Sequence, residues 1–261
     1  MLDIKYIRKY PEEVKKAIKA KKEKADLDKI LDLDKKKRDV LSKVERLKKE
    51  RNEKSKEIGK AKKNGLDISA VSKEMGALSQ KIKDYDTQIA QISEDLNNLM
   101  LWVPNIPMED VPHGTEEKNI VIRNWKEPKK ENFVHKPHWE LGTNLNILEL
   151  ERAAKIAGTS FTMYKGIGAR LERALLNFML DVQAKNGYRE INPPLLVNRK
   201  TLTGSGQLPK LENDMYFIAS DDFFLIPTSE VPLINFYQNE IIPADQLPIY
   251  LMASTPCFRR E

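Results

Sequence analysis

Residues 71–99 read VSKEMGALSQKIKDYDTQIAQISEDLNNL, and this stretch decides how the chain folds. Apolar or aromatic side chains recur along it at alternating steps of four and three residues. The series is Val71, Met75, Leu78, Ile82, Tyr85, Ile89, Ile92, Leu96 and Leu99. Such a heptad repeat is typical of a helix that packs lengthwise against another helix. The stretch therefore predicts one helix of a coiled coil.

A second, weaker heptad series precedes the first one. Its ten positions, seven of them apolar, are Ile30, Leu33, Lys37, Val40, Val44, Leu47, Arg51, Lys54, Ile58 and Ala61. Between the two series, Asn64-Gly65 tolerates positive φ and is expected to end the first helix. Asp67 or Ser69 is expected to cap the second helix. Because the connection is short, we predict that the two helices are antiparallel neighbours.

Basic charge gathers on the first helix of this predicted hairpin. Segment 35–63 contains 14 Lys/Arg and 5 Asp/Glu, whereas segment 67–98 contains 3 and 6. A basic stripe on a rigid element indicates a polyanionic partner, although the solvated surface of a thin hairpin would have a similar composition. Lys37, Arg51 and Lys54 fall on heptad positions, so we expect them to weaken the seam and to keep their charges in water.

Composition excludes several classes of protein. The 261 residues, 40% of them hydrophobic, are enough for two domains. The single cysteine, Cys257, excludes a disulfide framework, and with three histidines it leaves no Cys/His zinc pattern. No apolar signal core opens the chain, and no apolar run approaches the length of a membrane span. We expect a reduced, cytoplasmic protein with no membrane segment.

The pattern changes after the hairpin. Residues 5–25 predict a short basic amphipathic helix that leads into it, and the three prolines within 104–114 predict a linker. The predicted organisation is an N-terminal helical domain over 1–102, a linker over 103–118 and a second domain over 119–261.

The second domain alternates short strands and helices. We predict strands over 120–122, 161–164, 188–197, 215–218, 223–226 and 249–253, and helices over 145–157, 168–186 and 230–239. Few residues separate the strands, which favours an antiparallel sheet with flanking helices and an α+β fold class. The glycines of segment 203–209 predict a flexible surface loop, since the lysine-hydroxyl ending of a phosphate-binding loop is missing.

Two short stretches are candidates for chemistry. In an extended chain, the Thr228 hydroxyl and the Glu230 carboxylate would point the same way and hold a small substrate with hydroxyl and ammonium groups. Alternatively, Thr228 caps helix 230–239 and Glu230 occupies its first turn. In Phe258-Arg259-Arg260-Glu261, an arginine could bind a phosphate or carboxylate bidentately, or the stretch could be an ordinary charged tail.

Taken together, the segments resemble the bacterial-type seryl-tRNA synthetases, a class II aminoacyl-tRNA synthetase family. The resemblance covers the whole chain and rests on the order of its motifs behind a long coiled coil. The motifs are ERNEKSKEIG (50–59), VPNIP (103–107), YKGIGARLERAL (164–175), GSGQLPK (204–210), IPTSEVP (226–232) and TPCFRRE (255–261).

The resemblance implies a function for each motif. Region 168–194 would build a homodimer interface. The L-serine site would comprise Thr228, Ser229, Glu230 and Arg259, with Glu230 receiving the substrate ammonium group. The ATP site would comprise Arg259, Arg260 and Glu261, with Arg259 as the catalytic residue at the α-phosphate. Position 229 is commonly alanine in the family, so Ser229 is a mild departure, and the role of Arg260 stays open.

The implied activity is that of a serine–tRNA ligase. It would activate L-serine with ATP to seryl-adenylate and transfer serine to tRNA(Ser), with tRNA(Sec) as a further candidate. The arm residues expected to contact tRNA are Lys48, Arg51, Lys54, Lys56, Lys60, Lys62 and Lys63. Mg²⁺ is the expected cofactor beside ATP, with its ligands beyond residue 261 and no metal ligand within the chain.

The chain ends inside the motif that contains Arg259. We therefore expect these 261 residues alone to be catalytically incomplete. Two alternatives remain at this point: a non-catalytic fragment or paralogue whose coiled coil is an RNA-binding module, and a purely structural coiled-coil protein without an RNA partner.

Overall fold

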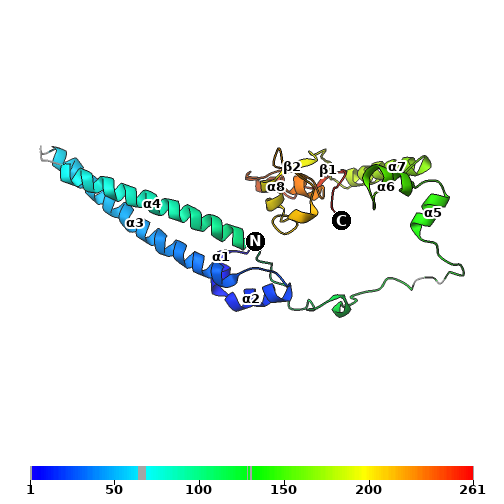
Figure 1. The fold of residues 1–261 in the computed structure, drawn as a ribbon, viewed down its shortest axis with the longest axis horizontal. Coiled ribbons are helices and arrows are strands. Elements are labelled where there is room, and N and C mark those ends of the chain that lie inside the picture. Colours follow the sequence, from blue (N-terminus) through cyan, green and yellow to red (C-terminus); the bar gives the residue numbers. More distant parts are fainter. Residues whose placement is uncertain (1, 64–68, 128, 130, 261) are drawn as a thin grey trace. The chain divides into compact units, whose positions relative to one another are not determined.

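A computed structural model describes residues 2–63, 69–127, 129 and 131–260 (Figure 1). The chain divides into two compact units, Met1–Ile122 and Arg123–Glu261. The predicted Asn64-Gly65 turn and the Asp67 cap lie outside the described residues, as do the side chains of residues 59–70.

The first unit is helical. Its elements are α1 (Ile4–Lys9), α2 (Pro11–Ala20), α3 (Leu27–Lys63), α4 (Ser69–Met100) and the short 3₁₀ helix η1 (Glu116–Lys118). The prediction of a single helix over 5–25 is wrong, because the chain forms α1 and α2 with a break at Tyr10. Pro11 has no N–H to donate to an upstream turn, and its fixed φ suits the first position of a new helix.

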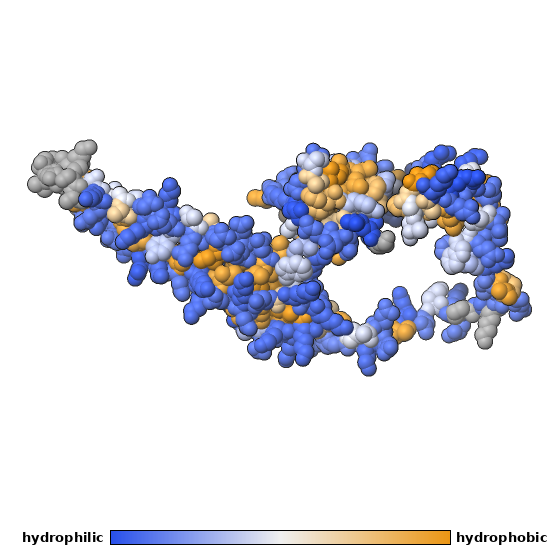
Figure 2. Space-filling view, viewed as in Figure 1, coloured by the Kyte–Doolittle hydropathy of each residue, from blue (hydrophilic) through white to orange (hydrophobic). Residues whose placement is uncertain are grey.

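The coiled coil is confirmed at each position of the 71–99 series, since all nine side chains are buried or half-buried. Its buried centre consists of Val40, Val44, Leu78, Ile82 and Ile92. The helices run antiparallel, because Lys48 pairs with Asp86 and the later Lys54 pairs with the earlier Glu74. Figure 2 shows a largely hydrophilic arm whose apolar side chains appear along the line between α3 and α4.

A second apolar cluster joins the base of the arm to α1 and α2. Its buried members are Ile7, Val14, Leu27, Ile30, Leu96, Met100 and Val103. Val103 lies in the predicted linker 103–118, and Ile106 packs against the same cluster. The chain therefore leaves this core only after residue 106.

One buried carboxylate links α1 to α3. Asp34 is 5% exposed, and its Oδ2 lies 3.4 Å from Arg8 Nε and 3.0 Å from Arg38 Nε. A carboxylate removed from water requires such partners: Arg38 donates a charge-assisted hydrogen bond, and Arg8 adds an ion pair.

The second unit holds a small antiparallel sheet and its flanking helices. The helical elements are α5 (His138–Asn144), α6 (Leu150–Ala157), α7 (Ile167–Lys185), α8 (Arg199–Gly204), α9 (Glu230–Ile234), η2 (Glu212–Asp214) and η3 (Ala244–Gln246). The strands are β1 (Arg189–Glu190), β2 (Leu196–Asn198), β3 (Phe217–Ile218), β4 (Phe223–Leu225) and β5 (Leu251–Met252). Strands β2, β4 and β3 form the antiparallel sheet in that order, as the predicted hairpin requires.

Several local predictions for this unit are wrong. Strand β1 pairs with β5 in parallel, so the unit also contains a two-stranded sheet that is not antiparallel. Residues 120–122 form no strand and lie exposed without a pairing partner, and segment 161–164 contributes only the bridge between Tyr164 and Leu148. The helix expected over 230–239 ends at Ile234.

The glycine-rich segment 203–209 is not a flexible surface loop. Leu208 is 4% exposed and packs with Leu202 and Phe224 in the core of this unit. The apolar side chain at 208 therefore fixes a segment that its glycines would leave mobile. No described helix combines the length and apolar character needed to cross a membrane.

We expect Asp34→Ala to lower the free energy of unfolding by about 1.5–3 kcal/mol, because Arg8 and Arg38 lose a buried charged acceptor. Urea unfolding followed by far-UV circular dichroism measures this loss. Asp39→Ala is the control, since Asp39 is exposed on the same helix and should change stability by less than about 0.5 kcal/mol. Equal effects of the two variants would contradict a special role for Asp34.

Candidate functional site

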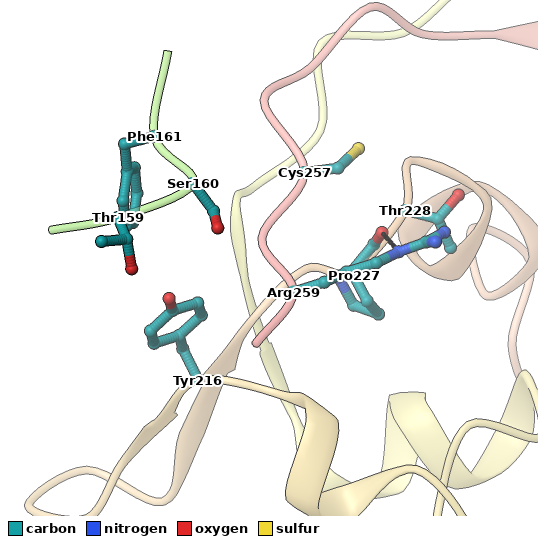
Figure 3. Close-up of a pocket in the computed structure, with 8 residues that line it drawn as sticks. All are labelled: Thr159, Ser160, Phe161, Tyr216, Pro227, Thr228, Cys257 and Arg259. Atoms are coloured by element: carbon teal, nitrogen blue, oxygen red, sulfur yellow. Dashed lines mark hydrogen bonds between the residues drawn. The ribbon is translucent and has the colours of Figure 1, made fainter. Parts of the chain in front are cut away.

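A cavity of about 530 Å³ in the second unit brings the two candidate stretches together (Figure 3). Its lining residues are Thr159, Ser160, Phe161, Tyr216, Pro227, Thr228, Cys257 and Arg259. Thr228 and Arg259 come from separate segments, so the fold itself creates their proximity.

Thr228 is positioned by the end of β4. Ile226 is fully buried after this strand, and the chain then turns at Ser229, with φ −61° and ψ −22°, into α9. The Glu230 N–H donates to Thr228 Oγ1 over 3.3 Å. The extended-chain expectation for 228–230 is therefore wrong. The alternative is confirmed for Glu230, which lies in the first turn of α9, but the N-cap is Ser229 rather than Thr228. Glu230 is exposed and does not line the cavity described above.

Arg259 lies on a segment that runs beside the end of β4. The Phe258 N–H donates to the Ile226 carbonyl over 2.9 Å, and Arg259 Nε donates to the Pro227 carbonyl over 3.1 Å. The second bond, dashed in Figure 3, fixes the guanidinium beside Thr228. The Arg260 N–H donates to the Asp214 carbonyl over 2.9 Å, and Arg260 does not line the cavity. Glu261 lies outside the described residues.

Ser229 faces a different space from Thr228. Its Oγ lies 2.7 Å from Thr255 Oγ1, and both residues border a second cavity of about 330 Å³ against α7. Of Thr228, Ser229 and Glu230, only Thr228 therefore lines the cavity that holds Arg259.

Sequence analysis did not assign six of the eight lining residues to a site: Thr159, Ser160, Phe161, Tyr216, Pro227 and Cys257. Thr159, Ser160 and Phe161 come from the turn after α6, and Figure 3 shows them across the cavity from Tyr216 and Arg259. Ser160 has φ 72°, a left-handed conformation that is uncommon for a residue with a Cβ. The alternation in 161–164 is the one sequence signal here, and it placed Phe161 on a strand face without indicating a cavity.

An ion-pair cluster joins the two ends of segment 149–165, which contains the lining residues Thr159, Ser160 and Phe161. Lys165 Nζ and Arg152 Nη1 both bond Glu149 Oε2, over 2.8 and 2.6 Å, and the Glu149 N–H donates to the Met163 carbonyl over 2.8 Å. The hydrogen bond from Lys165, followed by that from Arg152, holds the pKa of Glu149 below its ordinary value. The carboxylate therefore stays charged and keeps the two ends of segment 149–165 together.

On the arm, the structure sorts the basic residues by their partners. Lys54 sits half-buried on the seam and pairs with Glu50 and Glu74, and Lys48 pairs with Asp86. Arg51 is half-buried on the seam as well. Lys56, like Lys49, is exposed and forms no ion pair with any described residue. The side chains of Lys60, Lys62 and Lys63 lie outside the described part of the chain.

The exposed charges of α3 differ from one side to the other. Lys56 follows Lys49 by seven residues and lies on the same side of the helix, so basic charge repeats along this line, the line through Lys49 and Lys56. Lys43 and Arg46 lie on other lines, where the next heptad brings the acidic residues Glu50 and Glu53. The line through Lys49 and Lys56 is therefore the candidate surface for a polyanion.

Within the described residues, no group of three or more His, Cys, Asp or Glu side chains is arranged to hold a metal ion.

Comparison with known proteins identifies the relatives of this chain. Residues 1–107 match the family model of the seryl-tRNA synthetase N-terminal domain. The serine–tRNA ligases of Thermoanaerobacter pseudethanolicus and Acetivibrio thermocellus are each 50% identical to this chain. Each match covers 100% of this chain and 62% of the ligase. A seryl-tRNA synthetase from Pyrococcus horikoshii, solved in complex with ATP, matches 100% of this chain and 64% of its own with a TM-score of 0.85 and 30% identity.

These matches confirm the resemblance that the motifs gave and the predicted fold class. The chain spans 62% of the length of the curated relatives that it matches.

Replacement of Lys54 by Met is expected to raise the pKa of the Glu74 carboxyl toward its ordinary value, because the hydrogen bond from Lys54 lowers that pKa. Carbon-detected NMR titration of the glutamate carboxyls measures this shift. Since the pKa in the folded state lies below that of the unfolded chain, the pair stabilises the arm above the ordinary glutamate pKa and ceases to do so as the pH falls through the lowered value. Lys49→Met is the control and should leave Glu74 unchanged; an unmoved Glu74 in the Lys54 variant would contradict the pairing.

Proposed function

We propose that this chain, which is similar to seryl-tRNA synthetases over its whole length, forms the tRNA-binding arm and one wall of the serine-activation site in a serine–tRNA ligase. The ligase would activate L-serine with ATP to seryl-adenylate and then transfer serine to tRNA(Ser). One observation carries the proposal: the fold brings Thr228 and Arg259, the residues assigned to serine and ATP, to the same cavity.

The activation step joins two anions. The serine carboxylate must attack the α-phosphate of ATP, and their mutual repulsion opposes the approach. A guanidinium between them lowers this repulsion and stabilises the charge that develops at phosphorus. Arg259 meets the requirement, because its bond to the Pro227 carbonyl holds the guanidinium beside Thr228 before the substrates arrive. Such a reaction depends on positioning and charge and needs no protein nucleophile.

The amino acid would bind through the loop after β4. Thr228 lines the cavity, and a hydroxyl group suits a substrate that carries hydroxyl and ammonium groups. Glu230 is exposed on the first turn of α9, two residues after Thr228. We propose that its carboxylate binds the ammonium group of the substrate. We assign L-serine to these two residues together with Arg259.

ATP would lie beside Arg259, with Arg260 and Glu261 as its further contacts. The Pyrococcus horikoshii relative was solved in complex with ATP, which supports this assignment. Mg²⁺ would accompany the nucleotide, but the described residues offer no cluster for it, so no step is assigned to the metal.

The arm would bind the phosphate backbone of tRNA(Ser). Base edges of duplex RNA are poorly accessible, so lysines that contact phosphates suit this task. Lys49 and Lys56 are exposed and unpaired within the described chain, whereas Lys48, Arg51 and Lys54 engage acidic residues or the seam. The proposed compartment is the cytoplasm, where tRNA is charged.

A homodimer through region 168–194 completes the proposal. Helix α7 leaves large apolar side chains exposed, among them Leu171, Leu175, Phe178 and Met179, with 50 to 63% of their surface accessible. An apolar helix face of this kind favours a protein partner.

In the protein of full family length that contains this segment, Arg259→Ala is expected to lower serine-dependent ATP–pyrophosphate exchange about 10²–10³-fold, because the charge at the α-phosphate is lost. The matched control is Arg123→Ala, which removes an exposed arginine that does not line the cavity. Unchanged exchange in the Arg259 variant would contradict the proposed role.

For tRNA(Ser) binding by the present chain, the double variant Lys49→Ala/Lys56→Ala is expected to flatten the plot of log affinity against log salt by about 1–2 units, since each phosphate contact contributes somewhat less than one unit. Fluorescence anisotropy at several salt concentrations measures this slope. The control Lys43→Ala/Arg46→Ala also removes two exposed charges, but from the lines of α3 that include Glu50 and Glu53. Equal losses in the two variants would contradict the assigned binding line.

A further inference from the structure

We propose that Ser229 and Thr255 are positioning residues, whose paired hydroxyls set the register between the loop that carries Thr228 and the segment that carries Arg259. The proposal rests on the proposed function for what the register serves. It replaces the expectation that Ser229 touches the substrate serine.

The hydroxyl pair is well formed and lies off the main cavity. Ser229 Oγ and Thr255 Oγ1 are 2.7 Å apart, the usual distance for a hydrogen bond between hydroxyls, and both residues are half-buried. They border the smaller cavity against α7, together with Met179 and Leu180. Ser229 does not line the cavity that holds Arg259, and its hydroxyl is engaged by Thr255, so we assign it an indirect contribution to the site.

The pair also fills a gap in the hydrogen bonding of segment 253–257. Before this segment, the Ile191 N–H donates to the Met252 carbonyl over 2.9 Å, and after it the Phe258 N–H donates to the Ile226 carbonyl. Between these two points, the bond from Ser229 to Thr255 is the one hydrogen bond that ties the segment to another part of the described chain. Loss of this bond would leave five residues held only at their ends.

The position of Arg259 depends on this segment. The guanidinium bonds the Pro227 carbonyl, which lies two residues before Ser229, and Arg259 follows Thr255 by four residues. The two segments are therefore fastened at both ends of the cavity wall, by Thr255 with Ser229 at one end, and by Phe258 with Ile226 and Arg259 with Pro227 at the other. Because small displacements of a catalytic group reduce rates strongly, a slip between the segments would impair both substrates at once.

Cys257 reports on this register. It is the single cysteine of the chain, lines the main cavity, and lies between the two fastening points. Its Sγ is 3.7 Å from Thr255 Oγ1 and 3.6 Å from the Thr255 carbonyl oxygen, so movement of Thr255 changes the surroundings of the thiol.

The first test follows alkylation of Cys257 by N-ethylmaleimide in the present chain. Cys257 is exposed, so its rate depends on its contacts with Thr255; Ser229→Ala is expected to loosen them and raise the rate about two- to tenfold, the size of one hydrogen bond. Thr255→Val, which keeps the shape of the side chain, should raise it as well, whereas Thr255→Ser, which keeps the hydroxyl, should stay within about twofold of the parent. The double variant Ser229→Ala/Thr255→Val should react no faster than Thr255→Val alone, because the two hydroxyls act as one unit. An unchanged rate in Ser229→Ala, or additive effects, would overturn the proposal.

The second test measures ATP–pyrophosphate exchange in the protein of full family length. A positioning role predicts that Ser229→Ala raises the KM for both serine and ATP by about two- to tenfold. At position 255, Thr255→Val should raise both KM values as well, whereas Thr255→Ser, which keeps the hydroxyl, should retain those of the parent. A rise in the KM for serine alone would show direct contact with the amino acid and overturn the proposal. A parent protein without exchange would contradict the proposed function, while the alkylation rates would still decide whether the hydroxyl pair sets the register.

Discussion

A hairpin of two helices has no interior except the line of side chains between them, and the first unit depends on the burial of that line. Val40, Val44, Leu78 and Ile82 form its centre, and beyond the base of the arm, where α1 and α2 pack, no second layer covers the outer faces of the described arm. Helices of this length gain most of their stability from packing rather than from intrinsic propensity. The seam therefore keeps α3 straight over about 55 Å and leaves its outward charges available for a partner.

The seam also sorts basic residues into two kinds. Lys54 would weaken the apolar line if its ammonium group were unpaired there, and Glu74 reaches it from the opposite helix over 2.8 Å. That lysine is then committed to the fold. Lys56, two positions further on, faces solvent, and we propose that it contacts RNA. Residue type alone cannot separate these two lysines, whereas the position of each within the heptad does.

Sequence reasoning succeeded wherever the signal repeats along the chain. The heptads gave both arm helices, and alternation with a turn gave the hairpin of β3 and β4. It failed where distant segments decide the outcome. The parallel pairing of β1 with β5 joins residues some sixty positions apart, and Leu208 becomes buried only because Leu202 and Phe224 meet it. The place of Ser160 in the cavity wall also depends on a distant segment, since nothing in the local sequence pattern around Ser160 indicates its proximity to Tyr216.

Ser229 shows how a local turn separates the side chains of one short motif. The pattern Thr-x-Glu suggests three side chains at one site, but the turn into α9 rotates the middle side chain away from Thr228. A hydroxyl at that position then meets Thr255, and a methyl group would make no such bond. The residue that touches no ligand can still decide where Arg259 lies, because the two segments share only a few fastening points. A site assembled from the loop after β4 and the segment after β5 thus depends on the hydrogen bonds behind its wall as much as on the groups that line it.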